Sequence, residues 1–296
     1  MSEFLQQLIN GFSLGSTYAL IALGYTMVYG VLRFINFAHS DVFMVGAFTG
    51  FYASKHLPTE TFLGGLGALA SAMVVCAALG MLIEFLAYRR LRSGSKLNVL
   101  ITAIGVSLLL ENLGQYFFGA APKAFPALFP SKSINVSGLV VSTNQLAVLG
   151  IAILFLALLQ FIVLKTKIGA AMRAVSFNPT ASSLVGINNN TIISFTFGLG
   201  SALAGAGGIL YSMNYQSIDP FMGILPGLKA FVAAVLGGIG NIPGAALGGL
   251  LLGVIETFVN GSRFSTYTDA IAFTILIFIL LFRPAGLLGR PQVEKV

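Results

Sequence analysis

Six polar side chains stand within otherwise apolar stretches of this sequence, and they are the residues best suited to handle a polar solute. They are Asn36, His39, Asp41, Glu111, Asn112 and Lys229. Polar and ionisable groups at membrane depth are costly, so they usually line a substrate path or make a buried contact between helices. We expect the six to be candidates for such a path. A packing contact explains Glu111 and Asn112 equally well, and the polar group at residues 36–41 could instead cap a helix that starts near Asp41.

The sequence offers little for catalysis. It contains no G-x-x-x-x-G-K-[ST] motif, so the chain has no P-loop with which to bind ATP. Its two histidines and nine carboxylates are scattered, and they suggest neither a nucleophile with its base nor a metal site. We therefore expect a non-catalytic protein that carries no cofactor of its own and takes its energy from another source.

The composition is that of a membrane protein. Hydrophobic residues make up 56% of the chain and charged residues only 8%, whereas soluble domains carry about 25% charge. Repeated apolar runs of membrane-spanning length predict an all-α polytopic membrane protein that forms one domain over residues 1–296. The net charge of +7 does not indicate nucleic acid, because the basic residues lie in short loops beside apolar runs, where they face lipid headgroups.

The apolar runs give a first topology. They cover residues 6–30, 41–54, 61–88, 97–118, 143–164, 191–212, 226–258 and 268–282. Residues 237–244 interrupt the seventh run with four glycines and a proline, which predicts a broken or re-entrant pair and about eight to ten membrane segments in all. Glycine pairs four residues apart predict close helix contacts at Gly11/Gly15, Gly46/Gly50, Gly244/Gly248 and Gly249/Gly253.

The basic residues predict the orientation. Of the 16 lysines and arginines, eleven fall in segments that this topology places on one side: Arg33, Arg89, Arg90, Arg92, Lys96, Lys165, Lys167, Arg173, Arg283, Arg290 and Lys295. Short cytoplasmic loops are enriched in such residues. We therefore expect an outer N-terminus and a cytoplasmic C-terminus. Glu84 lies about one turn before the densest basic loop, so we expect it to pair with the arginines of that loop.

A short echo within the chain points to internal symmetry. The pattern Asn36-x4-Asp41-x-Phe43-Met44 recurs as Asn214-x4-Asp219-x-Phe221-Met222. The topology puts the two copies on opposite sides of the membrane, as an inverted repeat would. Four matched residues also arise by coincidence, so both explanations stay open.

The polar stretch at residues 165–190 contains a short helix with both ends encoded. Asn178 suits the N-cap, Pro179 the first helical position, and Gly186 the left-handed residue past the end. Ala181, Leu184 and Val185 would form a small apolar knob on one side. Such a helix is too short to be stable alone, so it must dock either on its own bundle or on a partner.

Three separate stretches resemble one transporter family. Met172, Arg173, Ala174, Asn178, Ala181 and Gly186 match the cytoplasmic signature of LivH-type permease subunits of branched-chain amino acid ABC importers. INFAHSDVFMVG at residues 35–46 and LKAFVAAVLGGIGNIPGAALGG at residues 228–249 also match, as does the ending GLLGRPQVEKV. The first motif departs from the family's usual N-F-A-H-G-E at Ser40 and Asp41.

This resemblance implies a complex in the bacterial inner membrane. A second, similar permease, two cytoplasmic ATPases that bind ATP and Mg²⁺, and an extracytoplasmic protein that delivers Leu, Ile or Val would complete it. Transport would proceed by alternating access, driven through the loop at residues 165–190. The residues expected to couple to the ATPases are Met172, Arg173, Ala174, Asn178, Pro179, Ala181, Leu184 and Gly186.

Other functions remain open from the sequence. The same architecture could carry urea, short amides or another amino acid. An ion-driven secondary transporter would instead rely on intramembrane acids such as Glu84, Glu111 and Glu256, and a channel would need neither ATP nor a binding protein.

Overall fold

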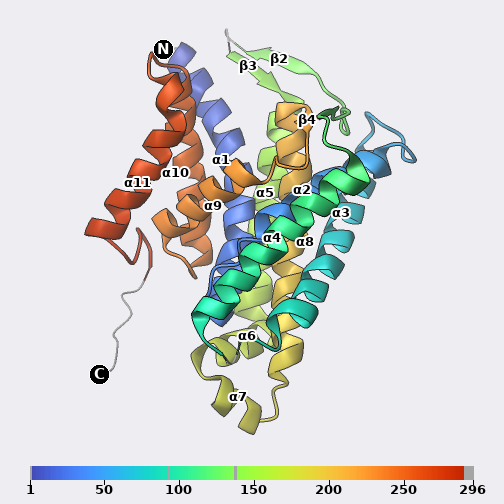
Figure 1. Cartoon of the computed structure of the whole chain (residues 1–296). Helices are drawn as coiled ribbons and strands as arrows, with labels where there is room; N and C mark the ends of the chain where they lie inside the picture. The colour runs from blue at the N-terminus through green and yellow to red at the C-terminus, as the bar shows by residue number, and fades with distance from the viewer. Residues whose placement is uncertain (1, 93, 137–138, 290–296) are drawn as a thin grey trace.

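Helices make up most of the structure, because a chain in lipid must satisfy its backbone hydrogen bonds internally. The computed structural model describes residues 2–92, 94–136 and 139–289 (Figure 1). The helices are α1 (Ser2–Leu32), α2 (His39–Ser54), α3 (Phe62–Ile83), the π-helical turn η1 (Glu84–Tyr88), α4 (Lys96–Phe118), α5 (Thr143–Lys165), α6 (Lys167–Phe177), α7 (Pro179–Leu184), α8 (Asn189–Tyr215), α9 (Ile224–Gly237), α10 (Ile242–Asn260), the 3₁₀ turn η2 (Ser265–Tyr267) and α11 (Thr268–Phe282).

Seven helical stretches in the described part of the chain are long and apolar enough to cross a membrane. They contain α1, α3 with η1, α4, α5, α8, α10, and η2 with α11, while α9 is apolar but shorter. The prediction of an all-α polytopic membrane protein is therefore confirmed. The number of membrane segments, about eight to ten from the sequence, stays a prediction.

Short strands lie at the end of the bundle where α1 begins, which we call the hairpin end (Figure 1). β2 (Ser133–Val136) pairs antiparallel with β3 (Leu139–Ser142), and β1 (Lys123–Ala124) pairs with β4 (Ser217–Ile218). The Gln6 side chain donates to the Val140 carbonyl and accepts from the Val140 N–H, both at 2.9 Å. The chain between α4 and α5 is thus held to α1 at Val140.

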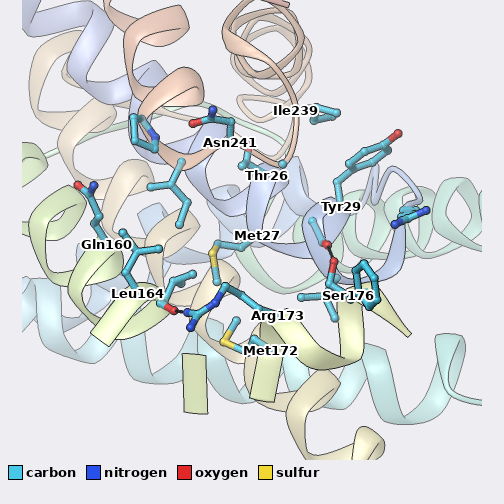
Figure 2. Close-up of a pocket in the computed structure, with 18 residues that line it drawn as sticks. Thr26, Met27, Tyr29, Gln160, Leu164, Met172, Arg173, Ser176, Ile239 and Asn241 are labelled. Carbon is cyan, nitrogen blue, oxygen red and sulfur yellow. Dashed lines mark hydrogen bonds between the residues drawn. The ribbon is translucent and has the colours of Figure 1, made fainter. Parts of the chain in front are cut away.

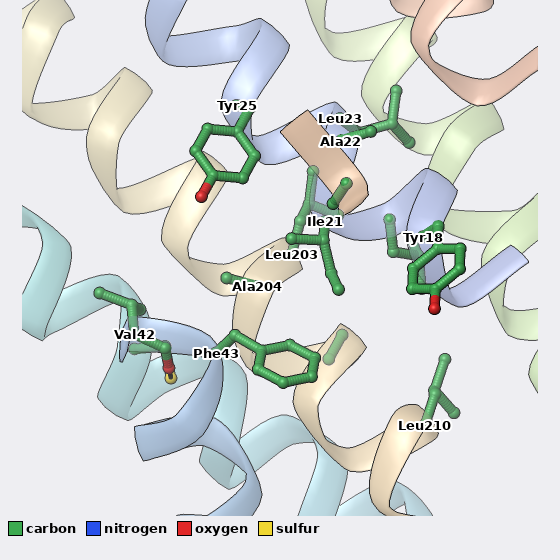
Figure 3. Close-up of a cluster of buried hydrophobic side chains, with 14 of the residues drawn as sticks. Tyr18, Ile21, Ala22, Leu23, Tyr25, Val42, Phe43, Leu203, Ala204 and Leu210 are labelled. Atoms are coloured by element: carbon green, nitrogen blue, oxygen red, sulfur yellow. Dashed lines mark hydrogen bonds between the residues drawn. The ribbon is translucent and has the colours of Figure 1, made fainter. Parts of the chain in front are cut away.

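The core is built on α1 and α8, which run in opposite directions through the middle of the bundle (Figure 1). Side chains from both helices meet there with Phe43 of α2 (Figure 3). Glycines let neighbouring backbones touch. A Cβ atom on Gly15 would lie 2.7 Å from the Leu250 Cα of α10, and one on Gly205 of α8 would lie 2.8 Å from the Ala72 carbonyl oxygen of α3. The close helix contacts predicted from the glycine pairs are confirmed at Gly15 and Gly253, whose backbones face each other.

Replacing Gly253 with Ala should therefore destabilise the protein. The added methyl group would collide with the Gly15 backbone, which has no side chain to move aside. Overpacking of this kind costs about 1–3 kcal/mol. Thermal unfolding of the purified protein in detergent should show a lower midpoint for Gly253→Ala. Gly150→Ala in α5 is the matched control, since no atom lies within 4 Å of its added Cβ, and an equal loss in both variants would contradict the explanation.

The bundle contains an inverted arrangement of elements. α1 is followed by a break at residues 33–38 and the short helix α2, and α8 is followed by a break at residues 216–223 and the short helix α9. Because α1 and α8 run in opposite directions, the two breaks enter the bundle from opposite ends (Figure 1). The short helices meet at their starts, where a Cβ on Gly227 would touch the Ser40 side chain.

The four-residue echo does not mark this symmetry. Asn36 lies in the break after α1, whereas Asn214 lies within α8. Asp41 lies in the first turn of α2, whereas Asp219 precedes α9. The elements are related, but the echoed residues do not occupy equivalent places in them.

The predicted interruption at residues 237–244 is confirmed as a turn between two antiparallel helices, α9 and α10, while the expectation that the pair re-enters the membrane stays a prediction. Gly238 and Gly240 have φ angles of +106° and +92°, which favour glycine. Asn241 caps α10 by accepting from the Gly244 N–H, and its amide donates to the Leu288 carbonyl at 2.6 Å. The turn lies beside the end of α1, near Gly30.

Candidate functional site

The short helix α7 lies at the end of the bundle opposite the hairpin end, and we call this the α7 end (Figure 1). Asn178 Oδ1 accepts hydrogen bonds from the N–H groups of Thr180 and Ala181, each at 3.0 Å. Pro179 occupies the first turn, and Gly186 has a φ of +86°. The predicted caps are confirmed, and the helix ends at Leu184.

The apolar knob of α7 is uncovered. Leu184 is 84% exposed, Val185 is 76% exposed and the preceding Phe177 is 89% exposed. Ala181 is also exposed. The alternative that this knob packs on its own bundle is therefore wrong. The side of α7 that faces the bundle is the polar one, where the buried Ser182 hydroxyl donates to Asn189 Oδ1 at 2.7 Å.

A second helix, α6, precedes α7 and was not expected from the sequence. Thr166 caps it by accepting from the Gly169 N–H at 3.1 Å, and Met172 and Val175 are buried on one side. The threonine cap and the apolar pair three residues apart were the available signals. α6 gives α7 a rigid support against the bundle.

Arg173 is bonded to its own chain. Its guanidinium donates to the carbonyl of Val163 in the last turn of α5, where a helix C-terminus attracts positive charge. Met172 is buried and Ala174 is half-buried. The eight residues expected to couple to an ATPase thus divide by position. The residues within α6 are Met172, Arg173 and Ala174. The residues at the two ends of α7 are Asn178, Pro179 and Gly186, and the exposed residues of α7 include Ala181 and Leu184.

A cavity of about 620 Å³ lies between α6, the end of α1, α5 and the α9–α10 turn (Figure 2). Its walls include Met27, Tyr29, Gln160, Arg173 and Asn241. None of the lining residues is a carboxylate. An amino acid bound there would have no counter-charge for its ammonium group, so the cavity does not suit the substrate expected from the sequence.

The basic residues fall into two groups, one toward each end of the bundle. Those in or beside elements that finish at the α7 end are Arg33, Arg89, Arg90, Arg92, Lys165, Lys167, Arg173 and Arg283. Lys55, Lys123, Lys132 and Arg263 lie toward the hairpin end. Arg290 and Lys295, also expected on the basic side, lie outside the described residues.

The polar group around the start of α2 is buried in the bundle. Asn36 accepts a hydrogen bond from the Tyr88 hydroxyl at 2.7 Å. The His39 ring lies against that of Tyr25, with centroids 4.6 Å apart and planes inclined by 59°, and its Nε2 makes no hydrogen bond to any described residue. The helix starts after Ala38, which has no side-chain cap, so the expectation that these polar residues cap α2 is wrong.

The structure brings Asp41 close to α4, the helix that contains Glu111 and Asn112. Asp41 accepts a hydrogen bond from the Ser107 hydroxyl of α4, one turn before the half-buried Glu111. Asn112 is exposed and donates to the carbonyl of Leu108 in its own helix at 2.7 Å. Within the described residues, no three His, Cys, Asp or Glu side chains lie close enough together to hold a metal ion.

Lys229 belongs to a separate cluster that joins three helices. Its ammonium group in α9 lies 2.7 Å from Glu256 Oε1 in α10 and 2.7 Å from Asp269 Oδ1 in α11. The side chains of Lys229 and Glu256 are only 9% and 5% exposed. The sequence identified Lys229 and Glu256 as unusual but did not indicate that they pair.

Glu84 forms the second ionic cluster, at the α7 end. Its fully buried carboxylate accepts from Arg89 at 2.9 Å and from Arg92 at 3.2 Å, as expected from the sequence. The hydrogen bond to Glu84 raises the pKa of Arg89 above its ordinary value. The Ser194 hydroxyl of α8 also donates to Glu84, a contact that the sequence did not suggest.

Comparison with known proteins places these features in context. The family described as branched-chain amino acid transport system / permease component matches residues 7–280. The chain is 46% identical over 302 residues to the high-affinity branched-chain amino acid transport system permease protein BraD of Pseudomonas aeruginosa, covering 99% of this chain and 98% of BraD. It is 42% identical over 303 residues to LivH of Salmonella typhimurium, with the same coverage. A probable LivH of Methanocaldococcus jannaschii is 31% identical over 291 residues, covering 91% of this chain and 88% of that relative.

Proposed function

This chain belongs to the family of permease components of branched-chain amino acid transport systems, and from that premise we propose that it is the membrane subunit of an ABC importer for leucine, isoleucine and valine. The observation that carries the proposal is the 46% identity along nearly the whole chain. An all-helical bundle with seven candidate spans suits such a subunit.

The energy for transport comes from partner chains. The sequence has no P-loop, so ATP is bound and hydrolysed elsewhere in the complex. Two cytoplasmic ATPases, a second similar permease and an extracytoplasmic binding protein complete the importer in the bacterial inner membrane. This chain contributes the path through the membrane and the surface that contacts the ATPases.

The α7 end faces the cytoplasm and contacts an ATPase. Two features support this placement: the basic residues gather at this end, and Leu184 and Val185 are exposed beside Phe177. Uncovered apolar side chains of this size at the tip of a bundle, among polar neighbours, are typical of a protein interface. With the α7 end inside, the N-terminus is extracytoplasmic and the C-terminus is cytoplasmic.

Movement of α7 by the ATPases drives alternating access. α7 contacts a partner through its knob, while α6 and α8 connect it to the bundle. The amino acid passes the polar group of Asn36, His39 and Asp41 and the half-buried Glu111 on α4, whereas Asn112 is exposed and bonded within its own helix. Lys229 is already bonded to two carboxylates, so we assign it to holding α9, α10 and α11 together.

Uptake of radiolabelled leucine into proteoliposomes tests the proposal. The complex is reconstituted with its binding protein outside and ATP inside. We expect uptake that requires ATP, persists when an ionophore collapses ion gradients, and is inhibited by excess isoleucine or valine but not by urea. Uptake that needs an ion gradient and ignores ATP would contradict it.

A further inference from the structure

The short helix α7 is hydrogen-bonded to the first turn of α8. Ser182 of α7 donates to Asn189 Oδ1 at 2.7 Å, and Asn189 Nδ2 donates to the Pro179 carbonyl at 2.7 Å. Asn189 therefore bonds to α7 through both atoms of its amide. Displacement of α7 must either break these bonds or carry the start of α8 with it.

The next residue links α8 to the end of α3. Asn190 accepts a hydrogen bond from Arg92, and Arg92 also donates to Glu84. One turn further along α8, Ser194 accepts from Arg89 at 2.7 Å and donates to Glu84. The buried Glu84 carboxylate is therefore the common acceptor for two arginines and for α8. Charge-assisted bonds of this kind are roughly twice as strong as neutral ones, so the junction is stiff.

The π-helical turn extends the connection into the bundle. The Arg89 N–H bonds to the Glu84 carbonyl at 2.8 Å, which closes the wide turn. Tyr88, at the end of the same turn, is fully buried and donates to Asn36 in the break before α2. An unbroken series of bonded elements thus runs from α7 through the start of α8 and η1 to the polar group beside α2.

We propose that Glu84 is a positioning residue that transmits the movement of α7 to α3 and to the polar break at Asn36. The inference rests on the proposed role of α7 as the ATPase contact. Each link joins a different element, so the network makes α7, the start of α8 and the end of α3 move as one body. Without Glu84, α7 still binds the ATPase, but its displacement no longer reaches the substrate path.

Glu84→Gln tests the proposal in the reconstituted importer. It removes the charge but keeps the size of the side chain. We expect ATP hydrolysis to continue while leucine taken up per ATP hydrolysed falls about tenfold, within the range of coupling between distant sites. Ser194→Ala is the milder second variant, which breaks one link and leaves both arginines paired, and it should lower the same ratio less. Arg90→Gln is the matched control, because Arg90 is exposed and makes none of these bonds.

The readouts separate this proposal from the docking role of α7. ATPase that co-purifies with Glu84→Gln at the wild-type ratio shows that docking is intact. A wild-type ratio of uptake to hydrolysis in both Glu84→Gln and Ser194→Ala would overturn the positioning role. Loss of the ratio in Arg90→Gln as well would also overturn it, since loop charge alone would then explain the effect.

Discussion

Replacing Leu184 with Glu is expected to abolish leucine uptake while the permease stays folded in the membrane. Leu184 is 84% exposed, so the change does not disturb the bundle. It places a charge in the centre of the apolar knob that we propose contacts the ATPase. Truncated anchors at interface centres commonly cost about 2–4 kcal/mol, so ATPase affinity should fall roughly 30- to 700-fold. Co-purification of the ATPase and ATP-dependent uptake measure the effect.

Ser183→Glu provides the control for this experiment. Ser183 is exposed in the same helix, and its hydroxyl donates to the Thr180 carbonyl at 2.8 Å. It points away from the side formed by Ala181, Leu184 and Val185, because successive helical residues turn by about 100°. We expect Ser183→Glu to keep most of its ATPase. A Leu184→Glu variant that binds ATPase normally would show that α7 is not the contact.

The second large effect is expected at Lys229. Lys229→Met removes the cation that is bonded to the buried Glu256 in the described part of the chain. Glu256 is 5% exposed, and its Oε2 has no hydrogen-bond partner among the same residues. Breaking a buried ion pair from one side costs about 3–5 kcal/mol. The variant should be recovered in low yield and should unfold at a clearly lower temperature in detergent. Lys132→Met at the exposed hairpin end should change neither.

A double variant distinguishes the structural role of Lys229 from a role in the substrate path. Lys229→Met with Glu256→Gln removes both charges, so much of the lost stability should return. If Lys229 instead contacted the amino acid, the single variant would be stable and inactive. Normal stability of Lys229→Met with a selective loss of leucine uptake would therefore refute the structural role.

Local features of the coupling segment could be predicted because they depend on nearby residues. The N-cap at Asn178, the proline beside it and the left-handed Gly186 act within a few residues of one another. The same is true of the break at residues 237–244. α6 was missed because its buried side is defined by packing on α1 and α5, which only the folded bundle provides.

Contacts between distant segments could not be predicted from one sequence. Glu84 and Ser194 are 110 residues apart, and Lys229 and Glu256 are 27 residues apart. Polarity alone marked Lys229 for the substrate path, yet its two carboxylate partners come from helices whose arrangement the pattern does not specify. The caps expected for α2 also failed, because the polar side chains of that segment turn inward to Tyr88 and Ser107.

The glycine contacts along α1 and α8 determine where this protein can bend. In an ordinary helix interface, side chains can change rotamer when one helix shifts slightly. Two backbones in direct contact have no side chain between them that could rearrange in this way. Sliding α1 along α10, or α8 along α3, would require whole helices to separate. Each of these two helix pairs should therefore move as one unit, so a displacement that reaches α8 carries α3 with it.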